Sequence, residues 1–340
     1  MNLDTNNRKN IVMASVIIGI FIASALLTIF IPTDEEGKEK TEMNESRERQ
    51  TDEKKRENGT VAVADPLEGD PYEELNSLIG LESVKAEVLS LANTVKVQKE
   101  REKQGLKNAK LTYHCVFTGN PGTGKTTVAR IIARIYKDLG VVKRGQFVET
   151  DRSGLIAKYE GQTAMKTNAV VDSALNGVLF IDEAYALVER DNGGYGAEAI
   201  ATLLKRMEDD RDRLVVIVAG YDKEMERFID TNPGLKSRFT RYIHFPDYSA
   251  DDLYRIFVMR AEKFNYRLDS EAEAFLKEKL EKTVAEKNRN FGNARYARNL
   301  FEQTVSNHAN RVAKIKTPSK SQLSVLKTED VQSAYQHVKP

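Results

Sequence analysis

Hydrophobic residues in the middle of the chain form two unbroken runs and one helical repeat. Val178–Ile181 and Leu214–Ala219 are wholly apolar, which is typical of buried strands. Leu111–Thr118 is predicted to be a further buried strand. After it, apolar residues recur at helical spacing at Val128, Ile131, Ile132, Ile135, Tyr136 and Leu139. Gly140 is expected to end that helix. The pattern predicts a strand, a glycine-rich turn and a helix in direct succession.

The turn between this strand and helix fits the phosphate-loop pattern G-x-x-x-x-G-K-[ST]. Its glycines let backbone N–H groups approach phosphate oxygens at the start of a helix, where negative charge is favoured. Lys125 adds a cation and Thr126 a hydroxyl for Mg²⁺. A glycine-rich turn without a ligand is the alternative. The predicted nucleotide-binding residues are Gly119, Asn120, Pro121, Gly122, Thr123, Gly124, Lys125, Thr126 and Thr127.

Two adjacent carboxylates, Asp182 and Glu183, directly follow the apolar run Val178–Ile181. An acid at a strand end can hold Mg²⁺ directly or through water, and we assign this role to Asp182. Glu183 projects differently and is expected to orient and polarise the attacking water. The alternative is a strand that ends in solvated acids. Together with the phosphate loop, the pair predicts an ATPase that uses ATP and Mg²⁺.

Composition limits the other possibilities. The 340 residues carry 52 Lys and Arg against 51 Asp and Glu, a net charge of +1, so no nucleic-acid partner is expected. The length allows a core of ordinary size and a smaller second domain. Cys115 is the single cysteine, which excludes an internal disulfide. Its place in an apolar strand suggests a small buried residue.

The segment Ile11–Ile31 has no charged residue, and its 21 residues are enough to cross a bilayer as a helix. We therefore predict a single membrane-spanning helix over residues 11–31, after a short tail over residues 1–10. A cleavable signal peptide is the alternative, but the apolar run continues past the small residues Ala23, Ser24 and Ala25. Because ATP is cytoplasmic, the long C-terminal part is expected in the cytoplasm.

The next segment is highly charged. From Asp34 to Glu57, 17 of 24 residues are charged and none is aromatic, so too little apolar surface exists to form a core. We predict a disordered tether over residues 32–70. A single charged helix stabilised by Glu–Lys pairs is the alternative, and it would still act as a spacer.

Several further segments follow in a recognisable order: Leu78-Ile79-Gly80-Leu81, Ser153–Thr163, Asn232–Phe239 and Phe291-Gly292-Asn293-Ala294-Arg295. With the phosphate loop and the acidic pair, they make the chain from about Tyr72 onward resemble the CbbX and stage V sporulation protein K branch of the AAA+ ATPases. The resemblance implies an α/β fold of the P-loop AAA+ type. A parallel five-stranded sheet flanked by helices is expected over residues 71–247, and a small helical lid domain over residues 248–340. In the lid, Ser249 and Asp252 have the spacing of a helix N-cap pair.

The resemblance also implies roles for particular residues. Ile79 and Gly80 match the motif that packs against adenine, and Arg295 matches the second sensor, which touches the phosphates from the lid. Arg238 aligns with the arginine finger, which reaches the γ-phosphate held by a neighbouring subunit. Tyr159 matches the pore-loop aromatic that grips a threaded polypeptide. Taken without the resemblance, Tyr159 is an ordinary surface tyrosine and Arg238 a solvated charge.

The strand Leu214–Ala219 leads into Ala219-Gly220-Tyr221, where many AAA+ proteins have Asn or Thr to hold the attacking water. The branch that the chain resembles has the same three residues, so hydrolysis stays expected, but the residue that fills the first sensor role is open. The residues Asn192–Gly196 are typical of a flexible loop, and the resemblance implies a second pore loop there.

The leading prediction is a membrane-anchored ATPase that forms a homo-oligomeric ring of six subunits and remodels an unknown protein client. A nucleotide-gated membrane scaffold that threads no substrate is the alternative. A small-molecule kinase is a third possibility, but the finger motif and the tether are against it.

Overall fold

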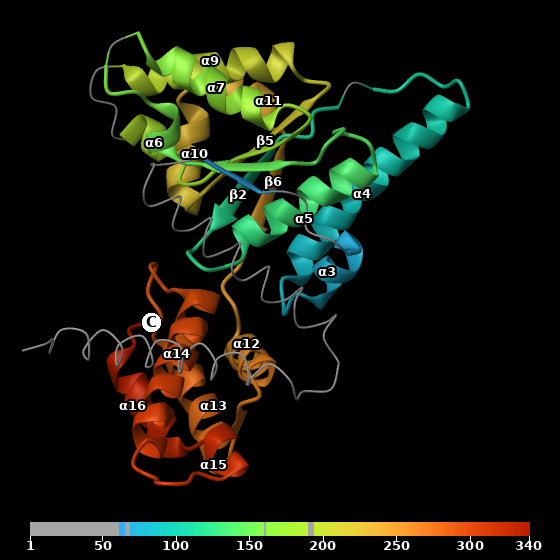
Figure 1. Ribbon diagram of the computed structural model, residues 1–340. Helices are drawn as coiled ribbons and strands as arrows, with labels where there is room; N and C mark the ends of the chain where they lie inside the picture. The colour runs from blue at the N-terminus through green and yellow to red at the C-terminus, as the bar shows by residue number, and fades with distance from the viewer. Residues whose placement is uncertain (1–60, 65–68, 110, 160, 190–193) are drawn as a thin grey trace, which may run out of the picture. The chain divides into compact units, whose positions relative to one another are not determined.

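The computed structural model describes residues 61–64, 69–109, 111–159, 161–189 and 194–340 (Figure 1). The predicted membrane segment 11–31, and the tether except for residues 61–64, 69 and 70, lie outside these residues. Among the helices of the described part, none is both long and apolar enough to cross a membrane.

A six-stranded sheet forms the centre of the nucleotide-binding part, with the strand order β1-β3-β4-β5-β2-β6. The last five strands in this order are mutually parallel, which confirms the predicted parallel five-stranded sheet. The strand bounds are β1 Val61–Ala64, β2 Cys115–Gly119, β3 Phe147–Thr150, β4 Gly177–Ile181, β5 Leu214–Gly220 and β6 Arg241–Phe245.

The sixth strand corrects one sequence expectation. Residues 61–64 were assigned to the disordered tether, but they form β1, which pairs antiparallel with β3 from Val61 opposite Thr150 to Ala64 opposite Phe147. The segment has only four residues, alternating Val and Ala. A strand this short is typical of a sheet edge, where it needs only one neighbour for its backbone hydrogen bonds. Strand β1 therefore joins the sheet at the edge next to β3.

The strand before the phosphate loop is also shorter than expected. It begins at Cys115 rather than Leu111, because its pairing with Ile217 of β5 and Arg241 of β6 starts there. Leu111 and Thr112 are exposed. The strand ends at Gly119, so the phosphate loop starts at the last paired residue.

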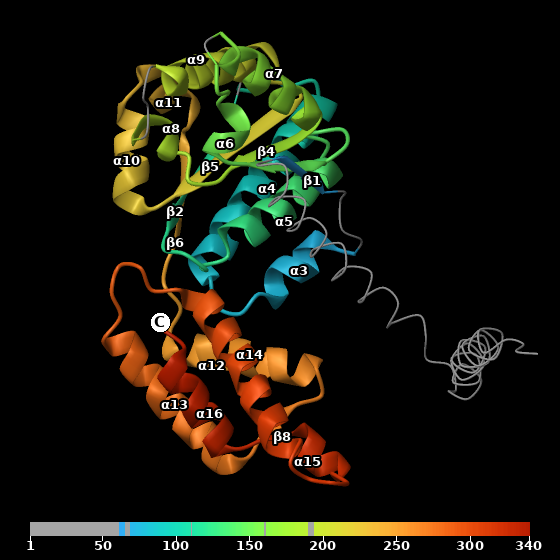
Figure 2. The same ribbon diagram turned by 60° about the vertical axis from the view of Figure 1, so that its left-hand side comes forward.

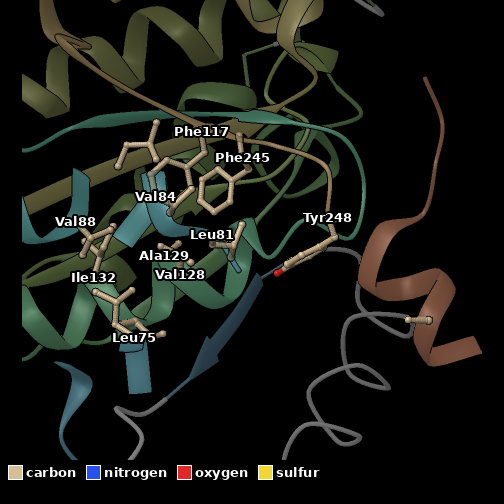
Figure 3. Packing of buried hydrophobic residues seen from close by; sticks show 14 of the residues in the cluster. Leu75, Leu81, Val84, Val88, Phe117, Val128, Ala129, Ile132, Phe245 and Tyr248 are labelled. Carbon is tan, nitrogen blue, oxygen red and sulfur yellow. The ribbon is translucent and has the colours of Figure 1, made fainter. Parts of the chain in front are cut away.

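Both faces of the sheet are covered by helices, and alternate residues of each strand point into two different cores. Phe117 belongs to the core beneath α4 (Glu82–Lys103) and α5 (Lys125–Asp138), whereas Val116 belongs to the core beneath α7 (Thr163–Ala174) and α9 (Tyr195–Asp209) (Figure 1). In the first core, Phe117 and Phe245 pack near Val128 and Leu81, so α4 and α5 are fixed against β2 and β6 (Figure 3). The phosphate loop thus starts from a rigid part of the sheet.

The helix predicted from the most regular apolar repeat is present in the structure. The repeat after the phosphate loop forms α5, which ends at Asp138, two residues before Gly140 with its positive φ of 61°. The helix bounds are α3 Pro71–Ser77, α4 Glu82–Lys103, α5 Lys125–Asp138, α6 Arg152–Leu155, α7 Thr163–Ala174, α8 Ala186–Glu189, α9 Tyr195–Asp209, α10 Asp222–Asp230 and α11 Pro233–Arg238.

The remaining helices form the predicted helical lid, in which α14 packs between α12 and α16 (Figure 2). Its first helix starts at the predicted N-cap: Ser249 accepts a hydrogen bond from the N–H of Asp252, and the Asp252 carboxylate accepts one in return from the N–H of Ser249. The lid elements are α12 Ala250–Lys263, β7 Arg267–Leu268, α13 Ser270–Ala285, α14 Asn293–Val312, α15 Lys320–Ser324, β8 Val325–Leu326 and α16 Thr328–His337.

Candidate nucleotide site

The phosphate loop needs glycine at three positions for reasons that the backbone shows. Gly119, Gly122 and Gly124 have φ values of 139°, 69° and 95°, which other residues rarely adopt. A side chain at Gly119 would also collide with the carbonyl oxygen of Phe245, and one at Gly122 with that of Gly292. The loop therefore lies so close to β6 and to the start of α14 that only bare backbone fits.

Lys125, the first residue of α5, folds back over this loop. Its ammonium group donates hydrogen bonds to the carbonyl oxygens of Gly119 and Asn120, both at 2.8 Å. Burial lowers the pKa of Lys125, while the carboxylates of Asp182 and Asp222 act against that shift. The buried hydroxyl of Thr123 donates to the Asn120 carbonyl at 2.8 Å and braces the loop from within. Thr126 is half-buried and Thr127 exposed on the first turn of α5.

The predicted acidic pair lies at the end of β4, which β5 separates from the phosphate-loop strand β2. The N–H of Asp182 donates to the Thr150 carbonyl at 2.8 Å, which continues the β3–β4 pairing by one residue. Burial raises the pKa of Asp182, and the nearby charge of Lys125 opposes this rise. Glu183 is exposed and has a positive φ of 48°, and its N–H donates to the Asp182 carboxylate at 3.0 Å. The two carboxylates therefore have different environments, as their predicted roles require.

Tyr221 directly follows β5, the strand that lies between the phosphate-loop strand β2 and the acidic strand β4. Its ring lies 5.8 Å from the ring of Tyr185, measured between centroids. Burial raises the pKa of the Tyr221 hydroxyl, the negative charge of Glu183 raises it further, and Arg295 opposes the shift. The Tyr221 hydroxyl therefore stays protonated near the acidic pair. It lies just after β5, where many AAA+ proteins have the Asn or Thr of the first sensor and this chain has neither.

The lid meets the phosphate loop at the start of α14. The N–H of Ala294 donates to the Gly122 carbonyl oxygen at 3.1 Å. Arg295, the next residue, is exposed, and its charge contributes to the low pKa of Lys125. The structure therefore places the predicted second sensor beside the loop.

The predicted adenine motif lies at the start of α4. Ile79 is half-buried, and Gly80 has a φ of 62° with the Asp252 carboxylate close to where a side chain at Gly80 would begin. The next residue, Leu81, and the hydroxyl of Tyr248 both lie near Gly124 of the phosphate loop. Leu81, just before α4, and Tyr248, in the connection between β6 and α12 (residues 246–249, here called the hinge), thus border the loop, as a base-binding position requires.

Arg238 does not join these residues. Its backbone carbonyl accepts a hydrogen bond from Thr112, and its guanidinium lies 3.7 Å from the Glu208 carboxylate and near His114. Thr112 and His114 precede the amino-terminal end of β2, whereas the phosphate loop follows its carboxyl end. At about 3.3 Å per strand residue, the length of β2 separates the two by about 16 Å. Arg238 cannot contact a phosphate bound by its own chain.

Tyr159 lies between α6 and α7. Its side chain is 69% exposed, and Met165 on the first turn of α7 is 73% exposed. Sequence reasoning missed Met165, although an apolar residue among polar neighbours so close to Tyr159 was a usable signal. Of the expected second pore loop, Asn192 and Gly193 lie outside the described residues, Gly194 is the N-cap of α9, and Tyr195 and Gly196 form its first two residues.

The chemistry of the site fits a nucleotide with a divalent cation. Glycine backbone and Lys125 suit phosphate oxygens, and the hydroxyl of Thr126 with the Asp182 carboxylate offers the hard oxygen ligands that Mg²⁺ prefers. The raised pKa of Asp182 marks a carboxylate that a cation would stabilise. Because the loop, the acidic pair and the lid meet at one edge of a parallel sheet, the fold and the site together define a P-loop ATPase with a helical lid.

The comparisons with known proteins agree with this class. Residues 115–247 match the ATPase family associated with various cellular activities (AAA), and residues 249–340 match the AAA lid domain. The chain is 39% identical over 259 residues to stage V sporulation protein K of Bacillus subtilis, covering 76% of this chain and 80% of that one. The chain therefore belongs to the AAA ATPase family, in the branch that contains stage V sporulation protein K and CbxX.

Another relative is longer. The ESX-3 secretion system protein EccA3 of Mycolicibacterium smegmatis is 48% identical over 243 residues, which are 68% of this chain and 40% of EccA3, so the chain spans about two fifths of that relative's length. Among solved structures, the FIGL-1 AAA domain in complex with ADP has a TM-score of 0.57 at 18% identity, covering 91% of this chain and 93% of its own. This likeness confirms the fold, and the family confirms the predicted ATPase class and its nucleotide binding.

Proposed function

We propose that this chain is a ring-forming, membrane-anchored AAA+ motor that binds ATP with Mg²⁺ and uses its hydrolysis to remodel a protein partner. In this proposal Lys125 and the loop glycines hold the phosphates, Thr126 and Asp182 hold Mg²⁺, and Glu183 polarises the attacking water. Mg²⁺ would supply charge neutralisation at the phosphates. AAA+ proteins generally form hexamers, and six is the ring size we propose.

The observation that carries the ring proposal is the position of Arg238. It lies at the opposite end of β2 from the phosphate loop of its own chain, held near Glu208. An arginine that stabilises developing charge on a phosphate must contact it, so Arg238 can act as a finger only at the site of another subunit. A ring of like subunits provides that site, because each then offers a finger to its neighbour.

Mixing two inactive variants tests this arrangement. Arg238→Ala in the full chain is expected to lose of order 10³-fold in ATP turnover. Glu183→Gln is expected to lose turnover for a different reason, the missing base. Mixed subunits should recover activity, because a Glu183→Gln subunit supplies a finger to a neighbour whose base is intact. Lys236→Ala, on the same short helix α11 and paired with exposed Asp230, is the matched control and should stay active.

Two results would contradict the motor. If the Arg238→Ala variant is a monomer and still hydrolyses ATP at the normal rate, the nucleotide-gated scaffold is favoured. Inactive variants that stay inactive after mixing, although size measurements show mixed rings, would exclude a finger that acts between subunits.

We propose that Tyr159 contacts the protein partner. Its exposure, with that of Met165, supports this role, because large exposed apolar side chains often mark protein-binding surfaces. The names of the relatives, from a secretion system and from sporulation, support a role in protein handling and leave the partner open.

The partner role can be tested with a permanently unfolded polypeptide such as carboxymethylated lactalbumin, added to the full chain during ATP turnover. Tyr159→Ala should abolish stimulation by the polypeptide and leave basal turnover intact. Tyr242→Ala, an equally simple loss of an exposed tyrosine on β6, should keep the stimulation. Equal stimulation of both variants would favour the scaffold, in which no substrate is gripped.

The membrane anchor over residues 11–31 stays part of the proposal on its apolar sequence alone, with the ATPase domain in the cytoplasm. Fractionation of cells that express the full chain, beside a chain that lacks residues 1–33, tests it. Recovery of both chains in the same fraction would remove the anchor from the proposal.

A further inference from the structure

Asp247 lies at the junction of the sheet and the lid, two residues after β6 and shortly before α12. Its carboxylate has three partners from distant parts of the chain. One oxygen accepts hydrogen bonds from the side-chain amides of Asn120 at 2.9 Å and Asn293 at 2.8 Å, and the other lies 2.8 Å from the ammonium of Lys287. Asn120 belongs to the phosphate loop, whereas Asn293 and Lys287 belong to the lid. One carboxylate thus joins the loop, the hinge and the lid.

Asn293 makes the same connection from the lid side. Its side chain is completely buried, and its amide nitrogen also donates to the carbonyl oxygen of Pro121 in the phosphate loop at 3.2 Å. Its side-chain oxygen accepts a hydrogen bond from the N–H of Tyr248 in the hinge at 2.9 Å. The backbone at Asn293 has a φ of 49°, which asparagine tolerates better than most residues. A polar side chain buried with all its groups satisfied fixes a single arrangement.

Asp247 and Asn293 connect two parts of the site that the proposed reaction needs, the phosphate loop and Arg295. Asn293 and the following Ala294 hold the phosphate loop at Pro121 and Gly122, and Arg295 comes next on the same turn of α14. A movement of the lid that breaks these hydrogen bonds would therefore release the loop and withdraw Arg295 at the same time. The ion pair between Arg289 and Glu224 of α10 at 3.0 Å also joins the lid to the sheet domain, and both of its partners lie outside the phosphate loop in sequence.

We propose that Asp247 and Asn293 are positioning residues that form a latch between the lid and the phosphate loop, and that this latch sets both the loop conformation and the place of Arg295. The inference rests on the proposed binding of nucleotide at this loop. The latch acts through Asn120, Pro121 and Arg295 and does not itself touch the nucleotide. Its loss weakens nucleotide binding and uncouples the lid from it.

Two variants in the full chain remove the latch without obvious strain. Asn293→Gly deletes the side chain and keeps a residue that adopts positive φ freely. Asp247→Ala deletes the shared acceptor, and Asp247→Asn keeps one acceptor oxygen as the conservative variant. We expect Asn293→Gly and Asp247→Ala to raise KM for ATP about tenfold or more, since hydrogen bonds to a charged group are lost. Asp247→Asn should restore most of the affinity. Arg289→Ala, which breaks the other contact between the domains, should leave KM unchanged.

The decisive readout is the distance between the lid and the sheet domain. Spin labels at Ser90→Cys on α4 and Ser306→Cys on α14 report it, because both serines are exposed. The native Cys115 is buried and its pKa is raised to about 12, so it resists labelling. In the labelled chain without further changes, and in labelled Arg289→Ala, we expect a narrow distribution of the distance between the two labels. ATP should narrow this distribution further. Asn293→Gly should broaden it, with or without ATP.

Three outcomes separate the possibilities. Latch variants that match Arg289→Ala in both KM and distance overturn the latch. A raised KM with an unchanged distance distribution also overturns it, because these residues then only shape the loop. If the unchanged chain binds no ATP, the proposed function fails, while the distance measured without ATP still decides whether the latch holds the lid.

Discussion

The ammonium group of Lys125 lies 2.8 Å from the carbonyl oxygen of Gly119, the residue that begins its own phosphate loop. The loop carbonyls thus hold the cation at the centre of the site, where Asp182 and Asp222 favour its charged form. Lys125→Met keeps most of the apolar stem and removes the charge. We expect ATP affinity to fall more than about tenfold while the fold is retained, because the lost group is the cation that faces phosphate.

Titration with a fluorescent ATP analogue and thermal unfolding of the full chain measure these two effects. Lys137→Met, an exposed lysine in the last turn of the same helix, is the control and should bind as the unchanged chain does. Equal affinities for the two variants would mean that Lys125 does not hold phosphate.

Asp182→Asn is expected to make the protein more stable and less active. Burial raises the folded-state pKa of Asp182 above its unfolded value, so the folded chain holds the proton more tightly. The destabilisation from the charged form is therefore absent below the unfolded pKa and grows as pH rises through the folded pKa. At pH 7 we expect a gain of about 1 kcal/mol in the free energy of unfolding, together with loss of Mg²⁺-dependent turnover.

Thermal unfolding of both chains between acidic and neutral pH checks the sign of this prediction. The gain should disappear below about pH 4, where an ordinary aspartate becomes protonated in the unfolded chain. A gain that is the same at every pH would show that packing, and not the charge of Asp182, is its cause.

Glu183 combines a functional position with a strained backbone. Its φ of 48° lies in the left-handed region, which costs a residue with a side chain more than it costs glycine. We expect Glu183→Gly to be more stable than Glu183→Ala by about 1 kcal/mol, although both lose turnover. Chemical denaturation of the two variants measures the difference. Equal stabilities would indicate that the backbone changes its conformation when the carboxylate is removed.

The sequence predicted the parts of the site that are short and contiguous. The loop from Gly119 to Thr126 and the acids at Asp182 and Glu183 are each encoded within a few residues, and the flanking apolar periodicity fixed their place on a strand end or a helix start. The positive φ of Glu183 could not be predicted, because glutamate gives no local signal for it.

Features that depend on distant pairing could not be predicted either. Strand β1 is a strand only because β3 offers a free edge to Val61–Ala64, and a short Val-Ala segment after a highly charged stretch of sequence gives a weak signal. The contacts of Asp247 with Asn120 and Asn293 join residues 127 and 46 positions away along the chain. Each of these residues alone resembles an ordinary polar residue of a turn. The position of Arg238 at the far end of β2 became visible only with the strand register.

Tyr221 offers the clearest test of how hydrolysis proceeds without Asn or Thr after β5. Its protonated hydroxyl lies under the influence of both Glu183 and Arg295, so it can donate a hydrogen bond to a water or a phosphate oxygen at this place. Tyr221→Phe keeps the ring that lies against Tyr185 and removes only the hydroxyl. We expect kcat to fall about tenfold or more with little change in KM, because the lost hydrogen bond serves the reaction and not ATP binding.

Steady-state ATPase assays of the full chain measure both constants. Tyr221→Leu, which loses the ring as well, separates the two contributions: normal kcat in Tyr221→Phe with a low kcat in Tyr221→Leu would assign Tyr221 to packing alone.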